Sequence, residues 1–210
     1  MSLESVSKTR LMPVAVIPTL ESALPLAEAL LEAGLPHIEI TLRTPCALDA
    51  MAAIRKAYPE MTVGAGTIID AGVLPKLVDM GVAFGVSPGL NPVVIEKAQS
   101  LDFLMIPGVI TPGEVERGLS MGLNLLKFFP AEQAGGAGMM KALAGPYGHT
   151  GVKFVPTGGI NAKNARPYLD LKVTEAIGGS WFVSKDLVQN GEFKKIVELT
   201  REALDLTQTS

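Results

Sequence analysis

The sequence predicts an α/β fold, a TIM (β/α)8 barrel, and three observations support this prediction. Short apolar runs recur eight times along the 210 residues, and each run starts 19 to 28 residues after the previous one. That interval accommodates one strand, one helix and two loops. Helical apolar periodicity fills the gaps, and no change of composition divides the chain. We therefore expect a single domain over 1–210, with an N-terminal helix at 1–11 that closes the bottom of the barrel formed by 12–205.

The eight expected strands can be read from the apolar runs in chain order. They lie within the segments 13–19, 37–43, 62–67, 84–89, 103–109, 125–131, 153–159 and 176–181. A doubly wound open sheet is the alternative architecture. It is less favoured because no strand is followed by a G-x-G-x-x-G turn and no Gly-Lys dipeptide is present to form a P-loop.

Capping residues predict where the helices between these strands begin and end. Residues that favour the N-cap position stand at four expected helix starts: Asp70, Asn91, Thr111 and Asn161. Glycines, which favour the left-handed backbone of a helix C-terminus, stand at three expected ends: Gly34, Gly81 and Gly122. The segment 185–205 is expected to form the last helix.

The composition excludes several classes of partner. The 18 basic and 21 acidic residues give a net charge of −3, so we expect no nucleic-acid partner. The longest span without charge, 80–95, is interrupted by prolines and is shorter than the about 20 apolar residues that cross a bilayer. We therefore expect no membrane partner. The single cysteine, Cys46, predicts a reducing, cytoplasmic location, and with two histidines it cannot complete an ordinary zinc site.

The segment 37–43 departs from the apolar pattern of a barrel strand. Alternation places three aliphatic side chains on the face that packs under the helices: Ile38, Ile40 and Leu42. The inward face then carries four polar side chains: His37, Glu39, Thr41 and Arg43. Burying an unpaired acid is costly, which indicates a functional reason for Glu39. His37 lies at the start of the strand, so we interpret it as a hydrogen-bonded core histidine.

The segment 125–131 places a lysine, Lys127, at the centre of a strand. Either assignment of the two faces leaves its amine among bulky hydrophobic side chains, where desolvation lowers the pKa of a lysine. Deprotonating an ordinary lysine at pH 7 costs about 4–5 kcal/mol, and an apolar environment reduces this cost, as in lysines that form Schiff bases. A structural ion-pair network of Glu39, Arg43 and Lys127 is the alternative interpretation.

Glycine pairs end the last two expected strands: Gly158-Gly159, and Gly178-Gly179 followed by Ser180. Backbone N–H groups at the ends of the seventh and eighth strands form a recurrent phosphate site in this architecture. In the segment 62–67, Thr67 is expected to lie beside Arg43, where the two side chains can bind a carboxylate.

Six motifs occur together in one order: Glu39-Ile-Thr-Leu-Arg43-Thr44, Gly64-Ala-Gly66-Thr67, Ser87-Pro88-Gly89, Lys127-Phe-Phe-Pro130-Ala131, Pro156-Thr-Gly-Gly159 and Gly178-Gly-Ser-Trp181. Over residues 12–204 the sequence resembles bacterial 2-keto-3-deoxy-6-phosphogluconate (KDPG) aldolases. Such enzymes often also cleave 4-hydroxy-2-oxoglutarate (KHG). The resemblance implies a homotrimeric Schiff-base lyase that uses no metal and no other cofactor, with a 2-keto acid carrying a distal phosphate as its substrate.

The resemblance also implies a role for each matching residue. Lys127 would form the imine, and Glu39 would move protons through a water. The contacts implied for the carboxylate of the 2-keto acid are Arg43, Thr67 and the backbone near Pro88. Phe129 would pack beside the pyruvyl carbons, and Thr157 would contact the sugar hydroxyls. The groups implied for the phosphate are Gly158, Gly159, Gly179 and Ser180.

Three other functions are compatible with the same motifs. An aldolase could act on another 2-keto-3-deoxy sugar acid, such as the galactonate epimer. A phosphosugar isomerase or epimerase could use general acid–base catalysis without a covalent step. A barrel that binds phosphate esters without catalysis is the third alternative. The segment 17–19 at the end of the first strand also offers no cation for a carboxylate.

Overall fold

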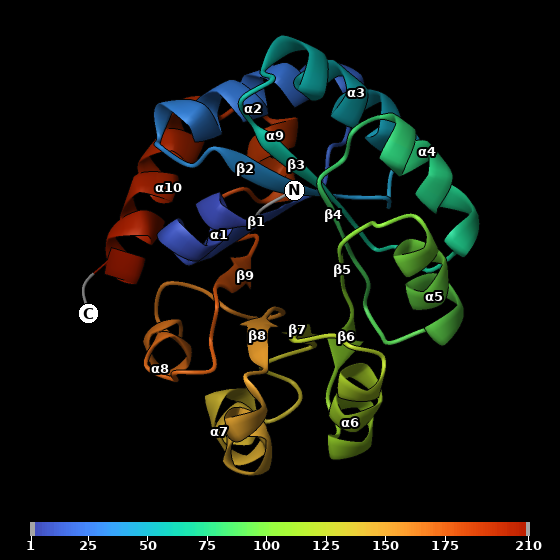
Figure 1. Cartoon of the computed structure of the whole chain (residues 1–210). Helices are drawn as coiled ribbons and strands as arrows, with labels where there is room; N and C mark the ends of the chain where they lie inside the picture. Colours follow the sequence, from blue (N-terminus) through green and yellow to red (C-terminus); the bar gives the residue numbers. More distant parts are fainter. Residues whose placement is uncertain (1–2, 209–210) are drawn as a thin grey trace.

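Parallel strands form a closed barrel, and helices surround it on the outside (Figure 1). The structure is a computed structural model that describes residues 3–208. This arrangement confirms the predicted α/β barrel. No helix in the described part of the chain is long and apolar enough to span a membrane.

Within residues 3–208 there are nine strand segments: β1 (Leu11–Ala15), β2 (His37–Thr41), β3 (Thr62–Gly66), β4 (Phe84–Val86), β5 (Met105–Ile106), β6 (Gly108–Val109), β7 (Leu125–Phe128), β8 (Lys153–Pro156) and β9 (Ile177–Gly179). They pair in the orders β5-β4-β3-β2-β1-β9 and β6-β7-β8. A parallel bridge between Thr157 and Gly178 joins β8 to β9. Only Pro107 separates β5 from β6, so the two series close into one ring.

The helices over the same range are α1 (Glu4–Thr9), η1 (Leu20–Ser22), α2 (Ala23–Glu32), α3 (Ala47–Ala57), η2 (Ala71–Val73), α4 (Leu74–Asp79), α5 (Pro92–Ser100), α6 (Pro112–Ser120), α7 (Gly136–Tyr147), η3 (Gly148–Thr150), α8 (Arg166–Leu169), α9 (Lys185–Gln189) and α10 (Phe193–Gln208). Here η marks a short 3₁₀-helix. Three of the predicted N-caps are confirmed, because the side chains of Asp70, Asn91 and Thr111 accept backbone N–H groups at the starts of η2, α5 and α6.

Apolar side chains pack in two groups, one inside the barrel and one between the strands and the helices. The inner group comprises Val6, Met12, Phe84, Val86, Ile106, Val155 and Ala176. The outer group includes Ile38 and Ile40 of β2, both completely buried, as alternation predicted. Fully burying a side chain of this size contributes about 1.5–3 kcal/mol to stability, so the two groups together hold the barrel closed.

The first helix covers the end of the barrel where the strands begin. Val6 of α1 belongs to the inner apolar group, and Figure 1 shows α1 inside the ring of helices. His37, at the start of β2, is completely buried there, and its Nε2 lies 2.7 Å from the carbonyl oxygen of Leu11. Burial lowers the pKa of His37 to about 4. These contacts agree with the interpretation of His37 as a core histidine at the base of the barrel.

Four details of the predicted elements were wrong. The N-terminal helix was predicted over 1–11, but α1 ends at Thr9 and Leu11 already begins β1. Residues 1–2 of that prediction lie outside the described residues. The segment 103–109 is not one strand, because Pro107 lacks the N–H group that would continue the ladder between β5 and β6. The segment 185–205 is not one helix, because Gly191 (φ +70°) ends α9 and the N–H of Glu192 bonds back to the carbonyl of Leu187. Asn161 accepts the N–H of Lys163 in a turn, and α8 begins only at Arg166.

Candidate active site

A cavity of about 220 Å³ opens at the carboxyl ends of the strands. All eleven residues predicted for the site line it: Glu39, Arg43, Thr67, Pro88, Lys127, Phe129, Thr157, Gly158, Gly159, Gly179 and Ser180. Four further residues complete its walls: Val14, Thr41, Ile160 and Gly178. The active sites of (β/α)8 barrels lie at this end, so the cavity is the candidate active site.

Lys127 projects into this cavity from the middle of β7. The neighbouring side chains of Leu126 and Phe128 point to the outer apolar group, which settles the face that alternation left undecided. Lys127 is 6% exposed, and its Nζ lies 4.7 Å from the centre of the Phe129 ring. Its backbone N–H donates to the carbonyl of Pro107 at 2.8 Å, so the ladder to the neighbouring chain segment fixes the strand that carries the amine.

Glu39 reaches the same cavity from β2 and is 1% exposed. Its Oε1 is buried and has no hydrogen-bond partner among the described residues. Burial raises the pKa of the Glu39 carboxyl, while the charges of Lys127 and Arg43 act in the opposite direction. A raised pKa brings a carboxyl group nearer to neutral pH, where it can both accept and donate a proton.

Gly66 of β3 provides the space that the Glu39 carboxyl occupies. A Cβ atom placed on Gly66 would lie 2.1 Å from Oε1 of Glu39, far inside van der Waals contact. The motif Gly64-Ala-Gly66-Thr67 thus has a steric role at the neighbouring strand, which the sequence motif alone did not reveal.

The alternative of a structural ion-pair network is not what the structure shows. Among residues 3–208 the ion pairs lie on exposed side chains, and none involves Glu39, Arg43 or Lys127. The amine and the carboxyl therefore face a shared cavity instead of neutralising each other in direct contact. Within the same range, no three or more His, Cys, Asp or Glu side chains are grouped where they could hold a metal ion.

Thr41 orients Arg43 at the rim of the cavity above β2. The hydroxyl of Thr41 donates to the carbonyl of Ala15 at 3.2 Å and accepts the Nε–H of Arg43 at 3.1 Å. Thr67 lines the same cavity with φ +63°, a left-handed backbone that β-branched residues rarely adopt. Such strain costs of order 1–3 kcal/mol and is typical of functional sites.

The glycine segment after β8 forms another wall of the cavity. Gly158 (φ +102°) and Gly159 (φ +77°) both have a left-handed backbone, which favours glycine strongly. Gly179 and Ser180 follow β9 next to them, since β8 and β9 are bridged at Thr157 and Gly178. The structure thus brings together both glycine pairs predicted for a phosphate.

Sequence reasoning placed Thr41 inside the barrel but assigned it no role, and it did not identify Val14 or Ile160 as parts of the site. Both aliphatic residues resemble core residues in the sequence, and only their position at the carboxyl ends of strands distinguishes them. Gly178 was part of a recognised glycine pair, and its position opposite Thr157 could be found only from the pairing of β8 with β9.

A family model described as "Aldolase: KDPG and KHG aldolase" matches residues 3–199. The chain belongs to this aldolase family. The KHG/KDPG aldolase of Escherichia coli K12 is 43% identical over 205 residues, which cover 97% of this chain and 95% of that protein. The 2-dehydro-3-deoxy-phosphogluconate aldolase of Dickeya dadantii is 42% identical over 192 residues, covering 91% of this chain and 89% of that one.

Solved structures of aldolases have the same fold as this family member. A KDPG aldolase from Legionella pneumophila, with pyruvate captured as a covalent carbinolamine intermediate, superimposes with a TM-score of 0.91 at 41% identity, covering 95% of this chain and 96% of that one. The KDPG aldolase of Zymomonas mobilis ATCC 29191 gives a TM-score of 0.90 at 39% identity, covering 100% and 99% of the two chains.

Proposed function

We propose that this family member is a Schiff-base aldolase that cleaves KDPG to pyruvate and glyceraldehyde 3-phosphate. It also cleaves KHG to pyruvate and glyoxylate. The observation that carries the proposal is one cavity that contains a buried amine, Lys127, a buried carboxyl, Glu39, and the glycine pairs after β8 and β9. The E. coli relative is named for both activities, and the Legionella relative holds pyruvate as a covalent carbinolamine, which supports the same chemistry.

The reaction begins at the amine of Lys127, which attacks C2 of the keto acid and, after loss of water, forms an iminium. This iminium accepts the electron pair of the C3–C4 bond when that bond breaks. Glu39 takes the proton of the C4 hydroxyl in the same step, and the aldehyde is released. The protonated Glu39 then returns the proton to C3 of the enamine. Water hydrolyses the resulting imine, which frees pyruvate and restores the amine.

The remaining wall residues bind the two ends of the substrate. Arg43 and Thr67, with the backbone at Pro88, bind the carboxylate next to the reacting carbonyl, and Phe129 packs against the pyruvyl carbons. Thr157 contacts the sugar hydroxyls. Backbone N–H groups of the two glycine pairs, together with Ser180, bind the distal phosphate.

The family resemblance also favours a cytoplasmic homotrimer. Two large apolar side chains, Ile69 and Val93, are 69% and 64% exposed, and burying them between subunits would remove apolar surface from water. Light scattering should give three times the chain mass of 22.1 kDa. A monomer at micromolar concentration would contradict the trimer and leave the aldolase proposal intact.

Borohydride trapping tests the covalent step directly. Incubation with pyruvate and sodium borohydride should add one reduced pyruvyl group to the protein, and peptide mass spectrometry should place it on Lys127. Lys127→Met should abolish the adduct. The exposed Lys141 of α7 provides the matched control, since Lys141→Met should leave labelling unchanged. An adduct on Lys141 or Lys153, or no adduct at all, would rule out the proposed mechanism.

A further inference from the structure

A buried tyrosine and a glutamate are paired behind the glycine segment, outside the set of residues that line the cavity. The hydroxyl of Tyr168 in α8 donates a short hydrogen bond to Oε1 of Glu132, three residues after Phe129. Tyr168 is 1% exposed, and Glu132 is half-buried. Burial, together with this hydrogen bond, raises the pKa of Tyr168 above its usual range, so the phenol keeps the proton that it donates.

Glu132 lies directly against the glycine segment. Its N–H donates to the carbonyl of Gly158 at 3.1 Å. A Cβ atom on Gly159 would lie 2.8 Å from Cβ of Glu132 and 2.9 Å from its Cγ, so the aliphatic part of this side chain touches the Gly159 backbone. The backbone and the side chain of Glu132 therefore both contact the two left-handed glycines, although Glu132 is not among the residues that line the cavity.

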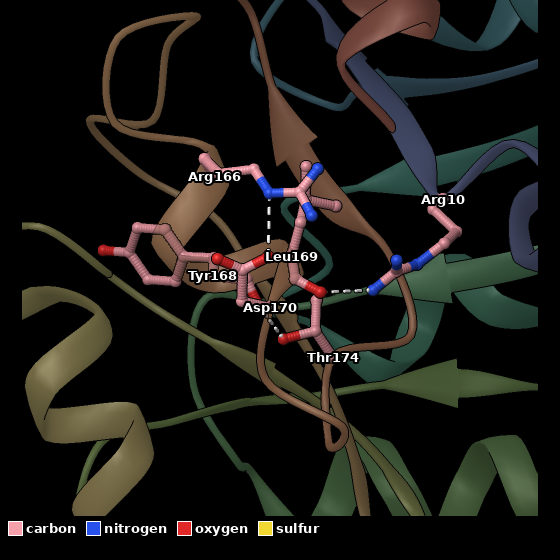
Figure 2. Close-up of polar contacts among 6 residues, drawn as sticks. All are labelled: Arg10, Arg166, Tyr168, Leu169, Asp170 and Thr174. Atoms are coloured by element: carbon pink, nitrogen blue, oxygen red, sulfur yellow. Dashed lines mark hydrogen bonds and ion pairs between the residues drawn. The ribbon is translucent and has the colours of Figure 1, made fainter. Parts of the chain in front are cut away.

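The other partner, Tyr168, is held by the body of the barrel. The Thr174 hydroxyl donates to the carbonyl of Tyr168 at 2.6 Å, and Arg10 donates to the carbonyl of Leu169 at 2.8 Å; both contacts are drawn as dashed lines in Figure 2. Arg10 directly precedes β1, so α8 is tied to the base of the barrel. The aromatic ring of Tyr168 points away from Arg10 in the same view. Because α8 is held in place, the hydrogen bond from the Tyr168 hydroxyl restricts the position of the Glu132 side chain.

We propose that Glu132 and Tyr168 are positioning residues that hold the Gly158–Gly159 segment in the conformation that binds a phosphate ester. This inference rests on the proposed function, because it takes the glycine segment to be the phosphate-binding end of the site. Neither side chain touches the substrate. Their contribution is to fix backbone N–H groups that would otherwise sample the many conformations open to two adjacent glycines, which lowers the conformational cost of binding.

The two proposed substrates separate this role from a general structural one. KDPG carries a distal phosphate, whereas KHG carries none. Loosening the glycine segment should therefore raise KM for KDPG and leave KHG cleavage unchanged. Exchange of the pyruvate methyl protons uses Lys127, Glu39 and the residues that bind the carboxylate, and pyruvate has no phosphate, so this exchange should also be unchanged. A loss of folded protein would instead lower all three activities in proportion.

Three variants test the pair. Tyr168→Phe keeps the buried ring and removes the donor, and Glu132→Ala removes the acceptor. Each should raise KM for KDPG about tenfold, the upper range for one hydrogen bond, with kcat/KM for KHG within about twofold of the wild type. Glu132→Gln retains an oxygen that accepts from Tyr168 and should restore the wild-type KM. The double variant should lose no more than Glu132→Ala alone, because the two residues act through one bond.

The chain provides a matched control in a second tyrosine–glutamate pair. The hydroxyl of Tyr147 donates to Oε1 of Glu116 at 2.9 Å on the exposed surface between α7 and α6, outside the cavity lining. Tyr147→Phe should leave both KM values unchanged. If Tyr168→Phe or Glu132→Ala lowered KDPG and KHG cleavage equally, or changed neither, the inference would be wrong.

Binding of glycerol 3-phosphate, a phosphate ester that the enzyme cannot cleave, examines the glycine segment without turnover. Calorimetry should show a dissociation constant about tenfold higher for Tyr168→Phe than for Tyr147→Phe. If the wild type failed to form the Lys127 adduct while the two variants still differed in their dissociation constants, the proposed function would fail and the positioning role would stand. Equal dissociation constants in the two variants would overturn the positioning role alone.

Discussion

Replacing Gly66 with alanine should displace the carboxyl group of Glu39 without changing any polar atom of the site. The new Cβ would lie 2.1 Å from Oε1 of Glu39, about 1.3 Å short of the 3.4 Å at which ordinary contact begins. The backbone of Gly66 is not left-handed, so the substitution introduces no dihedral strain and its effect is steric. A misplacement of about 1 Å can cost on the order of 100-fold in rate, which corresponds to ~2.7 kcal/mol of barrier.

The assay is the exchange of the pyruvate methyl protons with deuterium, followed by NMR. Gly66→Ala should slow this exchange about 100-fold, while borohydride should still trap pyruvate on Lys127. Gly113→Ala is the matched control, because a Cβ atom at Gly113 in α6 meets nothing within 4 Å. Exchange within twofold of the wild type, in a variant with a normal unfolding curve, would show that Glu39 is not the proton-transfer group at C3.

Three further substitutions test a buried histidine at the base of the barrel, a threonine at the rim of the cavity and the N-cap of a helix on the outside. The pKa of His37 is about 4 in the folded chain and about 6.5 in the unfolded chain, so the unfolded chain binds more protons between these pH values. The free energy of unfolding should therefore fall by ~3 kcal/mol as the pH drops from 6.5 to 4. Urea unfolding of His37→Gln should show a flatter dependence of this free energy on pH. Thr41→Val removes the hydroxyl that accepts a hydrogen bond from Arg43. It should raise KM about fivefold for both KDPG and KHG and leave borohydride trapping of pyruvate intact. A rise in KM for only one substrate would contradict a carboxylate contact that both substrates share. Thr111→Ala removes the N-cap of α6 and should lower the unfolding free energy by about 1 kcal/mol in urea titrations without affecting kinetics; an unchanged midpoint would refute the capping role.

The spacing of the apolar runs was sufficient to predict the barrel. The errors of this prediction concern where single strands and helices begin and end. Pro107 divides a run that is apolar throughout, so its effect is a missing hydrogen-bond donor, which a hydrophobic pattern does not register. The division of the last helix at Gly191 had a visible signal in the Asn190-Gly191 dipeptide. Amphipathic residues continue on both sides of that dipeptide, and this pattern by itself favours one continuous helix.

The polar residues of the site could be predicted because they interrupt a barrel interior that is otherwise apolar. Glu39 and Lys127 are conspicuous for this reason. The direction of Lys127 could not be predicted, because both faces of a strand in this fold are buried and alternation cannot tell them apart. The pair of Glu132 and Tyr168 could not be predicted either, since 36 residues separate the partners and neither lies in a strand.

The left-handed threonine at the end of β3 limits how this enzyme can be made heat-resistant. Asparagine tolerates the backbone at position 67 better than threonine does, so Thr67→Asn is a substitution that a search for higher melting temperature would select early. The same substitution would remove the hydroxyl and the methyl group of Thr67 from the wall of the cavity. Engineering of this enzyme therefore has to measure turnover together with melting temperature, because selection for stability alone would favour variants that are stable but have low activity.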